Sequence, residues 1–166
     1  HVPKPAREER SGGGRPLGEI VRQPVFAVAV ISAAFGYGIM NLLMVATPLA
    51  MDFCSHPFAQ AAMVIQWHVV GMYAPGLFTG SLIRRYGTLK VILAGVALVG
   101  GCVAVALSGT TVTTFLVALA LLGVGWNFMY TGGTTLLTES YAPVEKARAQ
   151  GANDFAVFAT MGVSSF

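Results

Sequence analysis

Residues 91–138 read VILAGVALVGGCVAVALSGTTVTTFLVALALLGVGWNFMYTGGTTLLT and contain no charged side chain. A helix of about 20 apolar residues crosses a bilayer, so 48 uncharged residues are too many for one transmembrane helix. The polar cluster SGTT at 108–111 divides the stretch, because such residues are typical of turns. The sequence therefore predicts two membrane spans here, over about 91–108 and 112–138.

The same pattern continues on both sides of this stretch. No charged residue lies between Arg22 and Asp52, or between Asp52 and Arg84. These gaps predict spans over about 25–51 and 59–83, and a further apolar run predicts one over 151–166. Over the whole chain 55% of residues are hydrophobic and 10% are charged, whereas soluble domains carry roughly 25% charged residues. We expect an all-α, polytopic transmembrane bundle, and neither a soluble domain nor a disordered chain.

The first 23 residues differ in composition from the rest. Residues 1–23 are rich in proline, glycine and charge, which predicts a cytoplasmic linker that ends in a short amphipathic segment on the membrane surface. Residues 24–166 form the predicted membrane domain. Because the chain begins without methionine and the run 151–166 is too short to cross a bilayer, we expect the chain to be a fragment of a longer protein, with its last span truncated.

The ten basic residues indicate the orientation. Five lie in 1–23, three in 84–90 and two in 146–148, while the two remaining loops have none. Loops rich in lysine and arginine stay in the cytoplasm. We therefore expect a multi-pass protein of the cell (inner) membrane with residue 1 on the cytoplasmic side.

Two spans carry polar residues that are candidates for binding a substrate. Asn41 lies near the middle of the span 25–51, one turn after Tyr37. An intramembrane amide of this kind either faces a substrate or bonds a neighbouring helix, and the sequence leaves both alternatives open.

The span 112–138 has a longer polar stripe. Asn127 and Thr131 fall on one face together with two further threonines, with Trp126 and Tyr130 alongside. A polar stripe through a whole span favours a water-filled cavity over helix packing. The set predicted to bind substrate is therefore Tyr37, Asn41, Trp126, Asn127, Tyr130 and Thr131. Its side chains are uncharged, which argues against a highly charged ligand.

His68 lies within the span 59–83. Its unperturbed pKa of about 6.5 is near physiological pH, so it is a candidate proton carrier and transport could be proton-coupled. The alternative is a neutral histidine that bonds a neighbouring helix.

Residues for covalent chemistry are scarce. An enzyme needs a nucleophile or metal with acid and base groups, and His68 has no such set around it in the spans. There is no cluster of histidine, cysteine or acidic residues at metal-ligand spacing. We expect no enzymatic activity, no metal, no cofactor and no nucleic-acid partner. The partners expected are a small-molecule substrate and the lipid bilayer.

The loop after the second span shows a family resemblance. Residues 80–95 read GSLIRRYGTLKVILAG, which resembles the loop motif of the major facilitator superfamily at Gly80, Arg85, Gly87 and Lys90. Arg84 stands where the first half of that family has aspartate, and this weakened copy is typical of the loop between spans eight and nine. The chain thus resembles spans seven to eleven, in the C-terminal half of a twelve-helix transporter.

The resemblance implies a role for several residues. Spans 25–51 and 112–138 would line the central cavity, and the N-terminal half of the same transporter would complete it. Glu139 would pair with Arg84 or Arg85 as a cytoplasmic gate. The function implied is secondary active transport of a small organic solute by alternating access. A transport-inactive sensor or scaffold on the same fold, and an enzyme that uses His68, are the alternatives.

Overall fold

The structure is a computed structural model that describes residues 14–165. Within that range it is helical, without strands, which confirms the predicted all-α class. In chain order the helices are α1 (Leu17–Val21), α2 (Pro24–Phe53), α3 (Phe58–Tyr73), α4 (Gly76–Tyr86), α5 (Thr88–Ala106), α6 (Val112–Leu137) and α7 (Lys146–Ser164), with a 3-10 turn η2 (Pro143–Glu145) before α7.

Local sequence explains where the helices begin and end. Pro24 occupies the first turn of α2, where its missing N–H costs nothing. Thr111 caps α6, because its hydroxyl accepts a hydrogen bond from the Thr114 N–H at 3.2 Å. Gly87 separates α4 from α5 with a φ of 91°, a conformation that glycine adopts without a steric penalty.

Three of these helices, α2, α5 and α6, are long and apolar enough to cross a membrane. The expected span 59–83 is not one straight helix, because α3 and α4 meet at a bend of 41° and count as a fourth span only if taken together. Pro75 explains the difference, since it lacks the N–H that would continue the helix. The final helix, α7, begins at Lys146, before the expected start of the last span at 151.

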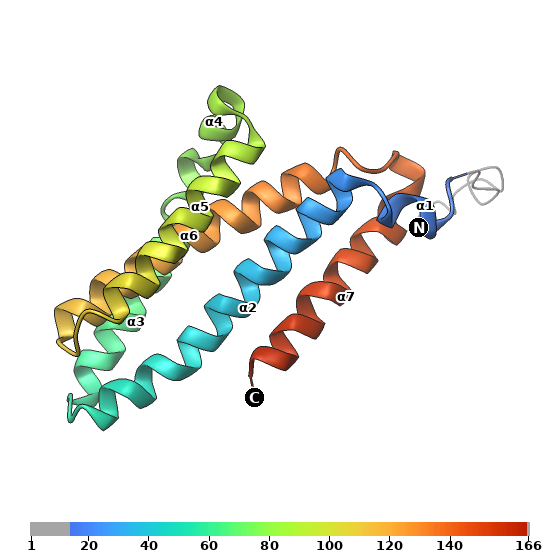
Figure 1. The fold of residues 1–166 in the computed structure, drawn as a ribbon. Helices are drawn as coiled ribbons and strands as arrows, with labels where there is room; N and C mark the ends of the chain where they lie inside the picture. The colour runs from blue at the N-terminus through green and yellow to red at the C-terminus, as the bar shows by residue number, and fades with distance from the viewer. Residues whose placement is uncertain (1–13, 166) are drawn as a thin grey trace, which may run out of the picture.

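Helix α6 lies at the centre and packs against α2, α3 and α5, while α7 packs against α2 (Figure 1). Glycines allow the backbones to approach closely. A Cβ atom on Gly123 would lie 2.6 Å from the His68 carbonyl oxygen of α3, and one on Gly133 would lie 2.9 Å from the Ala29 carbonyl oxygen of α2. Small residues at such contacts are typical of helix packing within membranes.

The helices alternate in direction, which separates the connections into two groups (Figure 1). The α1–α2, α4–α5 and α6–α7 connections lie at one end of the bundle, which we call the basic end because it carries Arg22, Arg84, Arg85 and Lys146. The α2–α3 and α5–α6 connections lie at the opposite end. Residues 1–13 of the expected linker lie outside the described residues.

Candidate functional site

Three aromatic side chains meet between α2 and α6. The rings of Trp126 and Tyr130 stack with centroids 5.2 Å apart and planes inclined by 7°. Tyr37 approaches both edge-on, at 5.3 Å from Trp126 and 5.1 Å from Tyr130. We call these three residues the aromatic cluster. The structure thus brings together three of the six residues that the sequence predicts to bind substrate.

Two neighbouring features place the aromatic cluster. Gly36 permits α2 to approach α6, because a Cβ atom there would lie only 3.3 Å from the Met129 Cβ. Trp126 and Tyr130 lie four residues apart in α6, which sets them on the same helix face. Edge-to-face and stacked arrangements are those that aromatic quadrupoles favour. The geometry is therefore a consequence of a glycine contact and of helical spacing.

The polar side-chain atoms of the aromatic cluster form no hydrogen bonds within the described residues. The Trp126 Nε1 is buried without a hydrogen-bond partner. Between residues 14 and 165 no hydrogen bond engages the hydroxyl of Tyr37 or of Tyr130, and both side chains are half-buried. A buried N–H is normally satisfied, and an exception calls for an explanation such as a ligand. The aromatic cluster thus combines a largely buried indole ring with two half-buried phenol rings, and all three donors are unpaired within the described residues.

Asn41 lies one turn further along α2 and bonds α7. Its Nδ2 donates to the hydroxyl oxygens of Ser164 at 3.0 Å and Ser165 at 2.9 Å, with the Met161 carbonyl oxygen at 3.4 Å. The amide nitrogen is thereby committed to the end of α7. These contacts are those of the helix-packing alternative.

Asn127 faces away from α2, toward α3 and α4. Its Nδ2 donates to the Met72 carbonyl oxygen at 2.8 Å, and its Oδ1 accepts from the Thr79 hydroxyl at 2.7 Å. The side chain is 6% exposed. Both halves of the amide are occupied by protein groups, so the contacts again correspond to helix packing.

The threonines of the polar stripe bond their own helix. The Thr134 and Thr138 hydroxyls donate to the carbonyl oxygens of Tyr130 and Thr135 respectively, at 2.9 and 2.7 Å. Hydroxyls in helices often bond the carbonyl three or four residues earlier. A polar stripe in the sequence therefore overstates the number of free polar groups. Thr131 itself is half-buried one turn after Asn127.

His68 is fully buried between α3 and α6. Its Nδ1–H donates to the Leu119 carbonyl oxygen at 2.8 Å, and its Nε2 has no partner within the described part of the chain. This arrangement corresponds to the neutral, helix-bonding alternative, because a charged imidazolium would leave a second donor unsatisfied in an apolar environment.

The predicted gate residues lie apart from one another in this conformation. Arg84 donates to the Ser81 hydroxyl at 3.0 Å, and the Arg85 guanidinium lies 5.3 Å from the centre of the Tyr86 ring. Glu139 is exposed and forms no ion pair within residues 14–165. Glu139 borders a cavity of about 420 Å³, which is also lined by Tyr86 at the end of α4 and Lys90 at the start of α5.

The ion pair that does form at the basic end involves two other residues. The Arg15 guanidinium contacts the Glu145 carboxylate at 2.8 and 3.0 Å, and also donates to the Ser140 carbonyl oxygen at 3.1 Å. Together with the backbone N–H groups of Arg15 and Ala142, it holds the pKa of Glu145 at about 2. Sequence analysis missed this pair, since 130 residues separate its members and no motif connects them.

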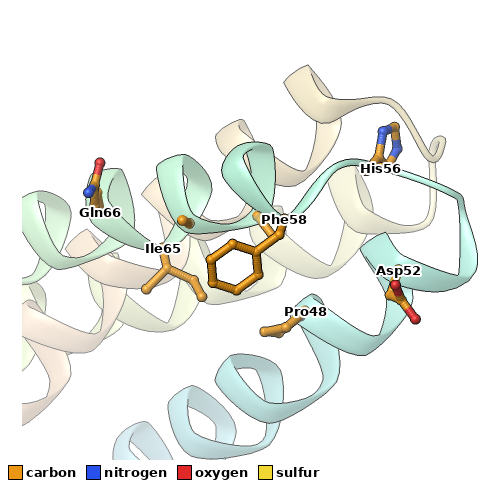
Figure 2. Close-up of a pocket in the computed structure, with 8 residues that line it drawn as sticks. Pro48, Asp52, His56, Phe58, Ile65 and Gln66 are labelled. Atoms are coloured by element: carbon orange, nitrogen blue, oxygen red, sulfur yellow. The ribbon is translucent and has the colours of Figure 1, made fainter.

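A separate cavity lies at the opposite end of the bundle, between the end of α2 and the start of α3 (Figure 2). It measures about 330 Å³. Pro48, Phe58 and Ile65 form its apolar wall, and Asp52, His56 and Gln66 are its polar members. None of the aromatic cluster lines this cavity.

Three long apolar helices and one bent helix pair, packed around a central glycine-rich helix, define a multi-pass membrane protein. Comparison with known proteins gives the family. The chain matches the Major Facilitator Superfamily over residues 1–165 and belongs to that family. The family, the all-α fold and the long apolar helices agree with what the sequence predicts.

Relatives among known proteins carry transporter names. The chain is 44% identical over 153 residues to the riboflavin transporter RfnT of Brucella anthropi. The aligned region covers 92% of this chain and 38% of that transporter. It is 35% identical over 118 residues to the uncharacterised MFS-type transporter YddS of Bacillus subtilis, in an alignment that covers 70% of this chain and 27% of that protein. The chain thus spans less than two-fifths of these relatives. No solved structure matches it.

Proposed function

We propose that the protein to which this chain belongs is a secondary transporter that moves a small, neutral, flat heteroaromatic solute of the riboflavin type by alternating access. The chain supplies one wall of the solute site, and the N-terminal half of the same transporter supplies the other. Such sites lie near the bilayer midplane at the interface of structural repeats.

The aromatic cluster is the observation that carries this proposal. A stacked pair, Trp126 and Tyr130, with Tyr37 at its edge presents the kind of surface on which a flat ring system packs. The Trp126 N–H and the two tyrosine hydroxyls supply hydrogen bonds for the polar rim of such a ring system. The similarity to a protein named as a riboflavin transporter supports this chemical class.

The remaining predicted residues take secondary roles in the proposal. Thr131 lies on α6 one residue after Tyr130, and Asn41 fixes α7 beside the aromatic cluster through its bonds to Ser164 and Ser165. Proton transfer through His68 is not included, because the ring is fully buried and bonded to Leu119.

The two tryptophans of the chain allow a matched test. Trp126 is 5% exposed within the aromatic cluster, whereas Trp67 is 55% exposed on α3. Riboflavin binding to the purified full-length protein is measured by quenching of flavin fluorescence. Trp126→Phe removes the indole N–H and part of the stacking surface, and should weaken binding by up to roughly tenfold, the equivalent of one neutral hydrogen bond. Trp67→Phe should leave the affinity unchanged.

Competitors extend the same measurement. Lumichrome, which retains the flat ring system without the sugar-alcohol chain, should displace riboflavin, and ribitol should not. The phosphorylated flavin should compete poorly, because the aromatic cluster offers no cation to pair with its phosphate. Equal affinities in the two tryptophan variants would refute the proposed site.

A further inference from the structure

The junction between α3 and α4 is where one membrane span loses its regular hydrogen bonding. Pro75 has no N–H, so the Gly71 carbonyl oxygen cannot receive the bond that a continuous helix would give it. The two helices meet there at 41°. Sharp bends in helices occur at prolines, and the carbonyl groups around them need other partners.

A side chain from another helix supplies such a partner to the Met72 carbonyl oxygen, next to Gly71. The Asn127 Nδ2 of α6 donates to the Met72 carbonyl oxygen before the junction, and its Oδ1 accepts from the Thr79 hydroxyl after the junction, at 2.8 and 2.7 Å. The Thr79 hydroxyl is equally close, at 2.7 Å, to the Pro75 carbonyl oxygen, so its single proton is shared between these two acceptors. One buried amide therefore connects both sides of the bend.

The two helices are held differently on either side of the junction. Helix α3 is fixed to α6, because a Cβ atom on Gly123 would lie 2.6 Å from the His68 carbonyl oxygen and 2.9 Å from the Gly71 carbonyl carbon. In α4 only Thr79 is buried, a Cβ atom on Gly80 would meet nothing within 4 Å, and Leu77 is 91% exposed. Helix α3 is thus packed closely on α6, whereas α4 buries only Thr79 within the described part of the chain.

We infer that Asn127 is a positioning residue for the transport cycle: it sets the angle between α3 and α4, and thereby the place of Arg84 and Arg85 at the basic end. Its neighbour in the chain, Trp126, belongs to the aromatic cluster. A solute on that cluster therefore acts on the same turn of α6 that holds the junction. The link to the solute rests on the proposed function, whereas the control of the angle rests on the hydrogen bonds alone.

Three substitutions test the hydrogen bonds of Asn127 and the missing N–H of Pro75 separately. Asn127→Leu removes both hydrogen bonds with little change in side-chain volume, and Thr79→Val removes one of them. Pro75→Ala restores the N–H that a continuous helix needs. Asn41→Leu is the matched control, because it removes a buried-face amide of α2 that bonds α7 and not the junction.

The angle is measured in the full-length protein, in lipid nanodiscs and without solute, as a distance between two spin labels. Labels at Ser81→Cys in α4 and Val25→Cys in α2 report on α4, in a background that lacks Cys54 and Cys102. Asn127→Leu should broaden and shift this distance distribution, Thr79→Val should do so less, and Pro75→Ala should give one shifted, narrower population. Labels at Val45→Cys and Gln66→Cys, which report on α3, should show no change in any variant.

Transport, expressed per amount of folded protein, gives a readout that a loss of folded protein alone would not move. A hydrogen bond present in one state changes the balance between states by about two- to tenfold. Riboflavin uptake by Thr79→Val should therefore show a maximal rate lowered by that factor and a KM within about twofold of the original. If Asn127 touched the solute, Asn127→Leu would instead raise KM.

The inference fails if the Ser81–Val25 distance distribution is the same in Thr79→Val and Pro75→Ala as in the unmodified protein. These two variants test the inference even if Asn127→Leu does not fold. It also fails if Asn41→Leu changes that distribution equally. Absence of riboflavin uptake by the unmodified protein would refute the proposed function alone, since the distances are measured without solute.

Discussion

Glu145 is the carboxylate with the largest number of partners at the basic end. Arg15, through its side chain and its backbone N–H, and the Ala142 N–H all bond it, and its pKa falls from a usual value near 4.5 to about 2. A carboxyl whose pKa is lower in the folded than in the unfolded protein stabilises the fold above the unfolded pKa. The contribution is then lost as the pH falls from about 4.5 toward 2.

This sign gives a prediction for the full-length protein. Glu145→Gln should lower the melting temperature at pH 7, and the difference from the unmodified protein should shrink as the pH is lowered from 4.5 toward 2. Glu19→Gln is the control, because Glu19 is exposed on α1 and should show no comparable difference. Melting is followed by intrinsic fluorescence in detergent. A difference that stays constant down to pH 2 would contradict the role given to Arg15.

At the scale of single residues, the sequence predicts which side chains share a helix face better than it predicts which neighbouring helix each side chain contacts. The helical spacing of Trp126 and Tyr130 on α6 placed them together correctly, because that spacing depends only on the helix. The contacts of Asn41 and Asn127 cannot be predicted without knowing which helix each side chain faces. In the structure Asn41 bonds α7, and Asn127 bonds α3 and α4. Nothing in a single sequence specifies that neighbour.

Among the helices, α6 determines the packing of the others. Its glycines at 123, 125 and 133 contact α3, α5 and α2 respectively at distances that leave no room for a side chain. The long uncharged stretch 91–138 therefore provides both two spans and the surface on which the bundle assembles. Sequence alone located these two helices, because length and the absence of charge are local properties.

Gly123→Ala should destabilise the bundle. Its added methyl group would meet backbone atoms of α3, which cannot move aside as a flexible side chain can. Overpacking of this kind costs typically about 1–3 kcal/mol. Gly100→Ala is the matched control on α5, since nothing lies within 4 Å of its Cβ position. Stability is compared by the yield and melting temperature of the full-length variants, and equal values for both would show that the α3–α6 contact is looser than described.

The bend at Pro75 falls inside the single span that the sequence predicts over 59–83. Residues 59–83 have the apolar length of one span, and a proline within a span is compatible with a single kinked helix. The division into α3 and α4 is stabilised by Asn127 and Thr79, which are contributed partly by a helix about fifty residues away in the chain.

For the whole molecule, the segment before α2 is joined to the α6–α7 connection. Arg15 bonds Glu145, Gln23 donates to the Ser140 carbonyl oxygen at 2.9 Å, and Ile20 is fully buried. These contacts connect α1, α2 and α7 at the basic end, while α4 lies at the other side of α5 and α6 (Figure 1). The orientation of the basic end toward the cytoplasm stays a prediction from the distribution of lysine and arginine.

The central claim is that the aromatic cluster binds a flat heteroaromatic solute that the whole protein carries across the membrane. Uptake of radiolabelled riboflavin into proteoliposomes that contain the full-length protein tests it most directly. The account predicts saturable uptake that exceeds that of protein-free vesicles, is abolished or strongly reduced by Trp126→Ala, and is retained by Trp67→Ala. Uptake by the unmodified protein no greater than by protein-free vesicles, or equal uptake by the two variants, would contradict it.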